Sequence, residues 1–135
     1  MANSTMQVEL VSLERMLYSG EAEMLVARTV EGEIGILPHH APLIGVLKIG
    51  ELRMILPGGQ EVVAAVHGGF MGVRDNRVIV LADAAELADQ IDVERARHAL
   101  ERAEAKLTHA EDAETQAALA RAHLRLHLRP GIRGT

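Results

Sequence analysis

Four arginines are the side chains whose type and spacing best suit the binding of an anion. Arg95 and Arg102 lie seven positions apart, about two turns of a helix. Arg121 and Arg125 lie four positions apart, about one turn. If the two helices fold back antiparallel, the four guanidinium groups can converge on a polyanion, which their planar forks bind well. The alternative is a solvated surface on which the arginines pair with glutamates, and spacing alone favours that surface.

Two pairs of histidines raise the question of a metal ion or a general base. His39 and His40 are adjacent, and no nearby acid or cysteine completes a coordination shell. His123 and His127 lie one helical turn apart, a metal-binding spacing that lacks a third ligand. We therefore expect no metal site and no catalytic residue. A small hydrolase that uses His39 or His40 is the enzyme alternative, and the sequence does not supply its acid or nucleophile.

Gly68 and Gly69 raise the possibility of a loop that holds phosphate. Such a loop continues into Lys-Ser or Lys-Thr, whereas this chain continues into Phe70 and Met71. We interpret the two glycines as a bulge or a crowded turn among strands.

The composition excludes several classes of function. The chain has 135 residues and a formal net charge of −5 at pH 7, whereas general nucleic-acid binders are basic. Tyr18 and Phe70 are its only aromatic residues, too few for stacking on single strands. The absence of cysteine excludes disulfide scaffolds and thiolate metal sites. Without a visible secretory signal or an apolar run of about 18 residues, we expect a cytosolic protein whose membrane association goes through a partner.

Glycine and proline divide the chain into two parts. Ten of the twelve glycines and three of the four prolines precede Ala82, whereas residues 92–129 contain neither. Helices exclude both residues, and turns between strands need them. The pattern predicts an α+β protein with a β domain at 1–85, a helical domain at 90–129 and a tail at 130–135.

The first part has the pattern of an antiparallel β-sandwich or flattened barrel. Turn signals at 57–60 and at Asp75 and Asn76 separate apolar runs, as in hairpins. The strands are predicted at 8–13, 24–30, 52–56, 61–66, 70–74 and 77–81.

The second part predicts an antiparallel hairpin of two helices with a turn at 108–114. Asp92 is the expected N-cap of the first helix. The predicted apolar stripes are Val93, Ala96, Leu100, Ala103 and Leu107, then Ala113, Ala117, Ala120, Leu124 and Leu128. Each buried methylene contributes about 0.8 kcal/mol, so these alanine-rich stripes hold less tightly than leucine stripes. We expect a hairpin that can leave the β domain without unfolding it.

The second helix is also basic. Between Thr115 and Thr135 there are four arginines, Arg121, Arg125, Arg129 and Arg133, and no acid. The preference of cations for a helix C-terminus explains one or two of them. The pattern therefore indicates docking to an acidic partner.

Three motifs follow one another along the chain. They are Gly-Glu-Ile-Gly-Ile-Leu-Pro-His-His-Ala-Pro-Leu at 32–43, Val-His-Gly-Gly-Phe-Met at 66–71 and Ile-Asp-Val-Glu-Arg-Ala at 91–96. In this order they resemble the epsilon subunit of bacterial F-type, proton-translocating ATP synthases, over roughly residues 6–129. The chain departs from that family's commoner form at His67, often serine there, and at Gly72, often a larger residue.

The resemblance implies a non-catalytic subunit of the central stalk, or rotor, at the cytoplasmic face of the bacterial plasma membrane. Its implied partners are the gamma subunit, the c-ring and the alpha and beta subunits, and no cofactor is required. The β domain would couple gamma to the c-ring. The loop at 32–43 faces the ring and gamma in this family, which makes Glu33 and His40 contact residues. The mobile helices would inhibit ATP hydrolysis when they extend along gamma.

The resemblance also implies ATP as a regulatory ligand. Some bacterial epsilon subunits bind ATP through an Ile/Leu-Asp-x-x-Arg-Ala motif, an upstream acid and later arginines. The matching residues here are Glu86, Ile91, Asp92, Arg95, Ala96, Arg102, Arg121 and Arg125. The rival interpretation is a stand-alone small nucleotide-binding sensor.

Overall fold

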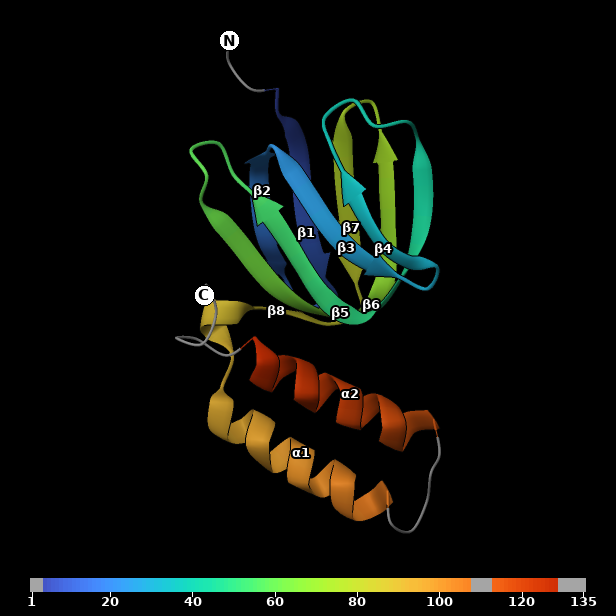
Figure 1. Cartoon of the computed structure of the whole chain (residues 1–135), viewed down its shortest axis with the longest axis vertical. Coiled ribbons are helices and arrows are strands. Elements are labelled where there is room, and N and C mark those ends of the chain that lie inside the picture. The colour runs from blue at the N-terminus through green and yellow to red at the C-terminus, as the bar shows by residue number, and fades with distance from the viewer. Residues whose placement is uncertain (1–3, 108–112, 129–135) are drawn as a thin grey trace. The chain divides into compact units, whose positions relative to one another are not determined.

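The structure, a computed structural model, describes residues 4–107 and 113–128 (Figure 1). The strands are β1 (Met6–Ser12), β2 (Met16–Ala22), β3 (Met24–Thr29), β4 (Gly32–Ile36), β5 (Leu43–Ile55), β6 (Glu61–Arg74), β7 (Arg77–Ala82) and β8 (Ala85–Leu87). The helices are the 3-10 turn η1 (Ala88–Gln90), α1 (Val93–Leu107) and α2 (Ala113–His127). The chain forms two compact units, Met1–Leu87 and Ala88–Thr135, called the β unit and the helical unit below.

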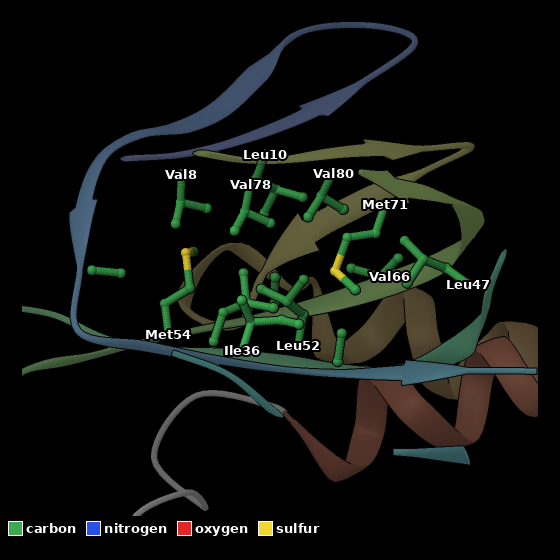
Figure 2. Packing of buried hydrophobic residues seen from close by; sticks show 14 of the residues in the cluster. Val8, Leu10, Ile36, Leu47, Leu52, Met54, Val66, Met71, Val78 and Val80 are labelled. Atoms are coloured by element: carbon green, nitrogen blue, oxygen red, sulfur yellow. The ribbon is translucent and has the colours of Figure 1, made fainter. Parts of the chain in front are cut away.

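The β unit is one sheet of eight strands that folds into two facing layers (Figures 1 and 2). The strand order is β2-β1-β7-β6-β5-β3-β4, and the short β8 pairs with β6. Strands β5 and β6 have 13 and 14 residues, so they are long enough to contribute to both layers. The order ends at two open edges, β2 and β4, which makes the unit a sandwich and not a closed barrel.

Apolar side chains from both layers fill the space between them (Figure 2). Val8, Leu10 and Val80 face Leu52 and Met54 across this core, and each is at most 1% exposed. Along β1 and β7, buried residues alternate with more exposed ones, as expected for strands covered on one face. Truncation of such a buried leucine costs about 2–5 kcal/mol, so these side chains dominate the stability of the β unit.

The predicted strands are found, but two of them are longer than predicted. The run at 52–56 is the second half of β5, which already begins at Leu43. The runs at 61–66 and 70–74 belong to one strand, β6, since the backbone stays in the sheet between them. The turn at Asp75 and Asn76 is confirmed, with φ of +51° and +59°.

The expected crowding at the paired glycines is confirmed. Gly68 and Gly69 lie inside β6 with φ of +84° and +127°. A β-carbon added to Gly69 would lie 2.1 Å from the carbonyl oxygen of Leu81. Only glycine fits there, so the pair lets β6 pass close to β7 where the sheet bends.

The pairing of β1 with β7 differs from the predicted antiparallel sheet. These two strands run parallel, from Gln7 opposite Arg77 to Ser12 opposite Ala82, while the other pairs of the described sheet are antiparallel. The alternation of buried and exposed residues is the same in both directions, so it could not reveal this difference.

Strand β2 has no clear signal in the sequence, because Ser19 and Gly20 are poor strand formers. It forms as an edge strand against β1. The Tyr18 ring covers Gly20, where an added β-carbon would lie 2.8 Å from the hydroxyl oxygen. The same hydroxyl donates to the Glu21 carbonyl at 2.9 Å. Burial, together with the Glu21 carboxylate, raises the pKa of Tyr18.

The two helices of the helical unit lie side by side and antiparallel (Figure 1). The predicted stripe of α1 is confirmed at Ala96 and Ala103, which are buried, and at Val93 and Leu100, which are half-buried. The side chain of Leu107 lies outside the described residues.

The predicted stripe of α2 is wrong at two positions. Ala113 and Ala120 are exposed, whereas Thr115 and Ala122 are buried. Alanines occur on every side of this helix, so the apolar pattern does not single out the face that packs. The remaining predicted positions, Ala117, Leu124 and Leu128, are half-buried or buried.

The predicted turn at 108–114 is only partly described. Ala113 and Glu114 already belong to α2, and residues 108–112 lie outside the described residues. The tail at 130–135 also lies outside them.

Candidate functional site

The segment 32–43 combines an edge strand with a turn. Strand β4 carries Glu33, which is exposed and lies opposite Arg28 of β3. His39 and His40 lie at the turn that follows, as predicted, and His39 has φ of +66°. The His40 backbone N–H donates to the Leu37 carbonyl at 3.1 Å, which closes the turn.

Asn76 fixes the position of this histidine turn. Its Oδ1 accepts the His39 backbone N–H at 2.8 Å, and its Nδ2 donates to the Thr5 carbonyl at 2.9 Å. The Asn76 carbonyl also accepts the Gln7 N–H at 3.2 Å. A single residue of the β6–β7 turn therefore ties the histidine turn to the start of β1. The sequence indicates Asn76 only as a turn residue, so this role was missed.

An apolar patch lies on the outer surface of three neighbouring strands. We call it the apolar face, and it consists of Ile44, Val46, Phe70, Ile79 and Leu81, which are 42–85% exposed. In the register of the sheet, Phe70 lies between Val46 and Leu81, and Gly72 lies between Ile44 and Ile79. Side chains opposite each other in a sheet are about 4.5–5.5 Å apart, so the five form one continuous surface. Contiguous exposed apolar surface marks a site of interaction.

Seven of the eight residues predicted to bind ATP belong to the helical unit, and Glu86 belongs to the β unit. Glu86 lies on β8, where its Oε1 is 3.6 Å from Nε2 of His67. The carboxylate is 30% exposed and the imidazole 2%. Glu86 therefore lies close to His67, a side chain of the same unit that can carry the opposite charge.

The motif 91–96 builds the start of α1. The Asp92 Oδ1 accepts the backbone N–H of Arg95 at 3.0 Å, which confirms the predicted N-cap. Ile91 and Ala96 are 5% and 2% exposed, so their side chains are buried in the protein. Any contact with a ligand would come from the polar residues of the motif. The motif thus has a structural role whether or not it binds a ligand.

The arginines differ in their present partners. Arg121 donates from Nη2 to the Glu114 Oε1 at 2.8 Å, the kind of pairing that the solvated-surface alternative expects. Within the described part of the chain, the guanidinium groups of Arg95 and Arg102 have no hydrogen bond or ion pair, and both residues are exposed. Two cations on α1 therefore remain available to an external anion.

Helix geometry places the four arginines on the same side of the hairpin. On α1, Arg95 and Arg102 directly precede the buried Ala96 and Ala103. On α2, Arg121 directly precedes the buried Ala122, and Arg125 follows it by three positions. Successive residues wind around the two helices of an antiparallel pair in opposite directions. The residue just before a buried position therefore lies on the same side of the hairpin in both helices. The predicted convergence is compatible with this arrangement.

No group of three or more His, Cys, Asp or Glu side chains in residues 4–107 and 113–128 could hold a metal ion. Arg129 and Arg133 of the basic segment lie outside the described residues. Among the described helices, none is long and apolar enough to cross a membrane.

A sandwich with an apolar outer face, followed by a hairpin with a cationic side, defines a protein that docks onto others. Residues 5–88 match the beta-sandwich domain of the ATP synthase delta/epsilon chain, and residues 89–128 match the long alpha-helix domain of the same chain. The chain belongs to the ATP synthase delta/epsilon chain family, which confirms the resemblance found in its motifs.

Two bacterial relatives cover most of the chain. The ATP synthase epsilon chain of Brevibacillus brevis is 54% identical over 105 residues, which is 78% of this chain and 80% of the relative. The ATP synthase epsilon chain of Thermobifida fusca is 52% identical over 122 residues, 88% of each chain.

Solved structures of two mitochondrial ATP synthases contain similar folds. A chain in the OSCP/F1/c-ring structure from Euglena gracilis matches with a TM-score of 0.73 and 27% identity, over 90% of this chain and 78% of that one. A chain in the central stalk/c-ring structure from Tetrahymena thermophila matches with a TM-score of 0.61. That match has 18% identity over 95% of this chain and 96% of the other, and it concerns the fold alone.

Proposed function

We propose that this chain is a non-catalytic rotor subunit of a bacterial F-type ATP synthase, where it couples the gamma subunit to the membrane c-ring. The apolar face carries the proposal, because five large apolar side chains in water require a partner surface. Membership of the delta/epsilon chain family supplies the assembly in which such a partner exists. The subunit has no active site of its own and needs no cofactor for this role.

Two contact regions of different character support a coupling role. The apolar face suits a stable partner, which we assign to gamma, because buried apolar area dominates lasting interfaces. The segment 32–43, with Glu33 and His40, is polar at its tip and suits the c-ring. Ile44 of the apolar face follows this segment directly in β5, so the two regions adjoin along the chain. A subunit that joins two partners needs such adjacent surfaces.

We assign inhibition of ATP hydrolysis to the helical unit. Its described helices bury alanines and one threonine, and Leu128 just after α2 is buried too, so less free energy opposes a change of position than a leucine seam would supply. Extended along gamma, the hairpin would obstruct rotation during hydrolysis, and folded it would not. Arg121 and Arg125, with Arg129 and Arg133 further along the sequence, would attract acidic loops of the catalytic beta subunits. A chain that ends near Asp112 should release hydrolysis in the assembled enzyme and leave synthesis largely intact.

We further propose ATP as the regulatory ligand of the folded hairpin. Arg95 and Arg102 have no partner among the residues that the structure describes, and helix geometry puts all four arginines on one side. Both observations support a polyanion ligand. The proposed set is Glu86, Ile91, Asp92, Arg95, Ala96, Arg102, Arg121 and Arg125. ATP that binds only the folded form favours that form by its differential affinity. We also assign the chain to the cytoplasmic face of the plasma membrane, where other subunits would hold it.

Co-purification with gamma tests the rotor role. Phe70→Asp combined with Leu81→Asp puts two charges into the apolar face and should abolish co-purification from a membrane extract. Leu13 offers a matched control, since it is 87% exposed and lies outside the apolar face. Leu13→Asp should co-purify with gamma like the unchanged chain. Retention of gamma by the doubly substituted chain would refute docking through this face.

The second candidate is a stand-alone nucleotide sensor, which the same four arginines would serve. Gel filtration of the chain with purified gamma distinguishes the rotor subunit from the stand-alone sensor. A rotor subunit elutes together with gamma, whereas a free-standing sensor binds ATP and elutes alone.

A further inference from the structure

His67 is a buried histidine that the proposed function does not use. Its side chain is 2% exposed, and neither ring nitrogen has a hydrogen-bond partner among the described residues. Buried polar atoms in native proteins are nearly always paired, and unpaired ones cost free energy. A group retained at such a cost calls for a role in a second state of the molecule.

The nearest charge to His67 comes from β8. Glu86 Oε1 lies 3.6 Å from Nε2, within ion-pair distance and beyond hydrogen-bond distance. Strand β8 has only three residues and pairs with β6 from Ala64 to Val66. The His67 backbone N–H donates to the Ala84 carbonyl at 2.8 Å, just before β8 begins. His67 therefore stands beside a short strand that few other bonds hold.

Other charged groups around His67 are mostly acidic. Glu51 of β5 lies opposite Ala65, so it is the diagonal neighbour of His67 on that strand. Arg53 is 3.6 Å from Glu51 and belongs to the next position on the same face. In the β7–β8 connection, the Asp83 carboxylate lies beside Gly68. The Glu86 carboxylate therefore lies directly beside the imidazole, whereas Glu51 is a diagonal neighbour that is paired with Arg53.

The geometry points to a proton-operated latch in which protonated His67 holds β8 against β6 through Glu86. An imidazolium attracts the Glu86 carboxylate, whereas a neutral imidazole leaves a buried and unpaired ring beside it. Docking of β8 is therefore stronger when His67 carries a proton. Histidine is the side chain whose charge most readily changes within the physiological pH range. We therefore expect the latch to close toward about pH 6 and to loosen toward about pH 8.

Strand β8 leads directly into η1 and α1, so the latch sets the length of the connection to the helical unit. Release of its three residues adds roughly 10 Å of extended chain, at about 3.3 Å for each residue. If the helical unit inhibits ATP hydrolysis as proposed above, which is the one step that rests on the proposed function, the distance that its hairpin can reach depends on pH.

Hydrogen exchange of the isolated full-length chain tests the latch without gamma or ATP. After correction for the intrinsic pH dependence of exchange, protection of the β8 amides should fall about tenfold or more between pH 6 and pH 8. His67→Gln and Glu86→Gln should each remove this pH dependence. His98→Gln, at an exposed histidine of α1, is the control and should retain it.

Equal protection of β8 at both pH values in the unchanged chain would overturn the latch. Full pH dependence of β8 protection in Glu86→Gln would overturn it too. If circular dichroism shows that His67→Gln does not fold, Glu86→Gln alone decides the question. Because no other subunit is present, a negative result leaves the rotor role untouched, and failure to bind gamma leaves the latch untouched.

Discussion

The β unit and the helical unit are held together by side chains of very different size. The fully buried side chains of the β unit include Leu10, Leu25, Ile36, Leu52 and Met54. In the helical unit, the buried side chains of α1 and α2 are Ala96, Ala103, Thr115 and Ala122, and the larger buried side chains among its described residues, Ile91 and Leu128, lie just outside the two helices. Burial of a leucine contributes about 1.5–3 kcal/mol and of a methyl group about 0.8 kcal/mol. One chain therefore combines a firmly packed platform with a weakly packed hairpin.

This difference matches the division of labour proposed for the chain. A docking surface such as the apolar face must keep its shape, and the two layers behind it are densely filled. A regulatory element must change position at low cost, and a seam of small side chains permits that. If the two roles are separate, a substitution or ligand that affects one unit should leave the other unchanged.

The largest effect should follow from a cavity in the platform. Leu52→Ala should lower the free energy of unfolding of the β unit by about 2–5 kcal/mol. Ala103→Gly should weaken α1 by about 1 kcal/mol and leave unfolding of the β unit unchanged. Urea denaturation followed by circular dichroism measures both. If each substitution shifted a single common transition, the two units would be one cooperative structure.

Next in size is the response of the hairpin to ATP. At a hundredfold excess over its Kd, ATP should stabilise the folded hairpin by about 2.7 kcal/mol and raise its melting temperature. Arg95→Ala, or Arg121→Ala with Arg125→Ala, should abolish this shift and the heat of binding in calorimetry. Arg97 is a matched control. It directly follows the buried Ala96, on the side of the hairpin away from the four arginines, and its Nη1 is 2.9 Å from the Glu94 Oε1.

Arg97→Ala should bind ATP as the unchanged chain does. Calorimetry without detectable binding at millimolar ATP would refute ATP as a ligand of the hairpin. That result would not test inhibition of hydrolysis through the basic second helix.

A smaller effect should come from the cap of α1. Asp92→Ala removes the side chain that accepts the Arg95 N–H, and it should destabilise the hairpin by about 0.5–2 kcal/mol. Asp89→Ala, at an exposed acid of η1, should change helicity little. Circular dichroism against temperature compares the two. Equal loss of helicity in both would contradict a specific capping role.

The smallest change in stability should come from the segment 32–43. Glu33→Arg, at an exposed residue, should alter stability by no more than about 0.5 kcal/mol. His40→Glu should do likewise, because its ring is partly exposed at a turn. Both should nevertheless weaken proton-coupled ATP synthesis in the assembled enzyme, whereas Glu61→Arg, exposed at the far end of β6, should not. Unchanged synthesis in both variants would remove the loop from the interface.

The fold could be predicted where local chemistry determines it. Asp75 and Asn76 tolerate positive φ, and Asp92 caps a helix, so the β6–β7 turn and the start of α1 follow from the residues themselves. Strand β2 could not be predicted, since an edge strand forms by pairing and carries little apolar signal. The packing face of α2 was missed because alanine is compatible with every side of a helix.

The candidate sites divide in the same way. Motifs contiguous in sequence, such as 32–43 and 91–96, could be found directly. The apolar face, the tie made by Asn76 and the pairing of His67 with Glu86 depend on strands far apart in the chain. An outward Phe70 on a strand that is apolar on both faces is the one signal that could have indicated a docking surface.

The parallel pairing of β1 with β7 also bears on the order of events during synthesis. Gln7 can pair early with Glu21 of β2, but it must wait for Arg77, seventy positions later, before it joins the rest of the sheet. Contacts of such long range are slow to form, because the intervening chain must first be brought into a loop. The hairpin of β1 and β2 is therefore among the last pieces to join the rest of the sandwich. Once β7 has left the ribosome the platform can close, before the helices that follow it have fully emerged.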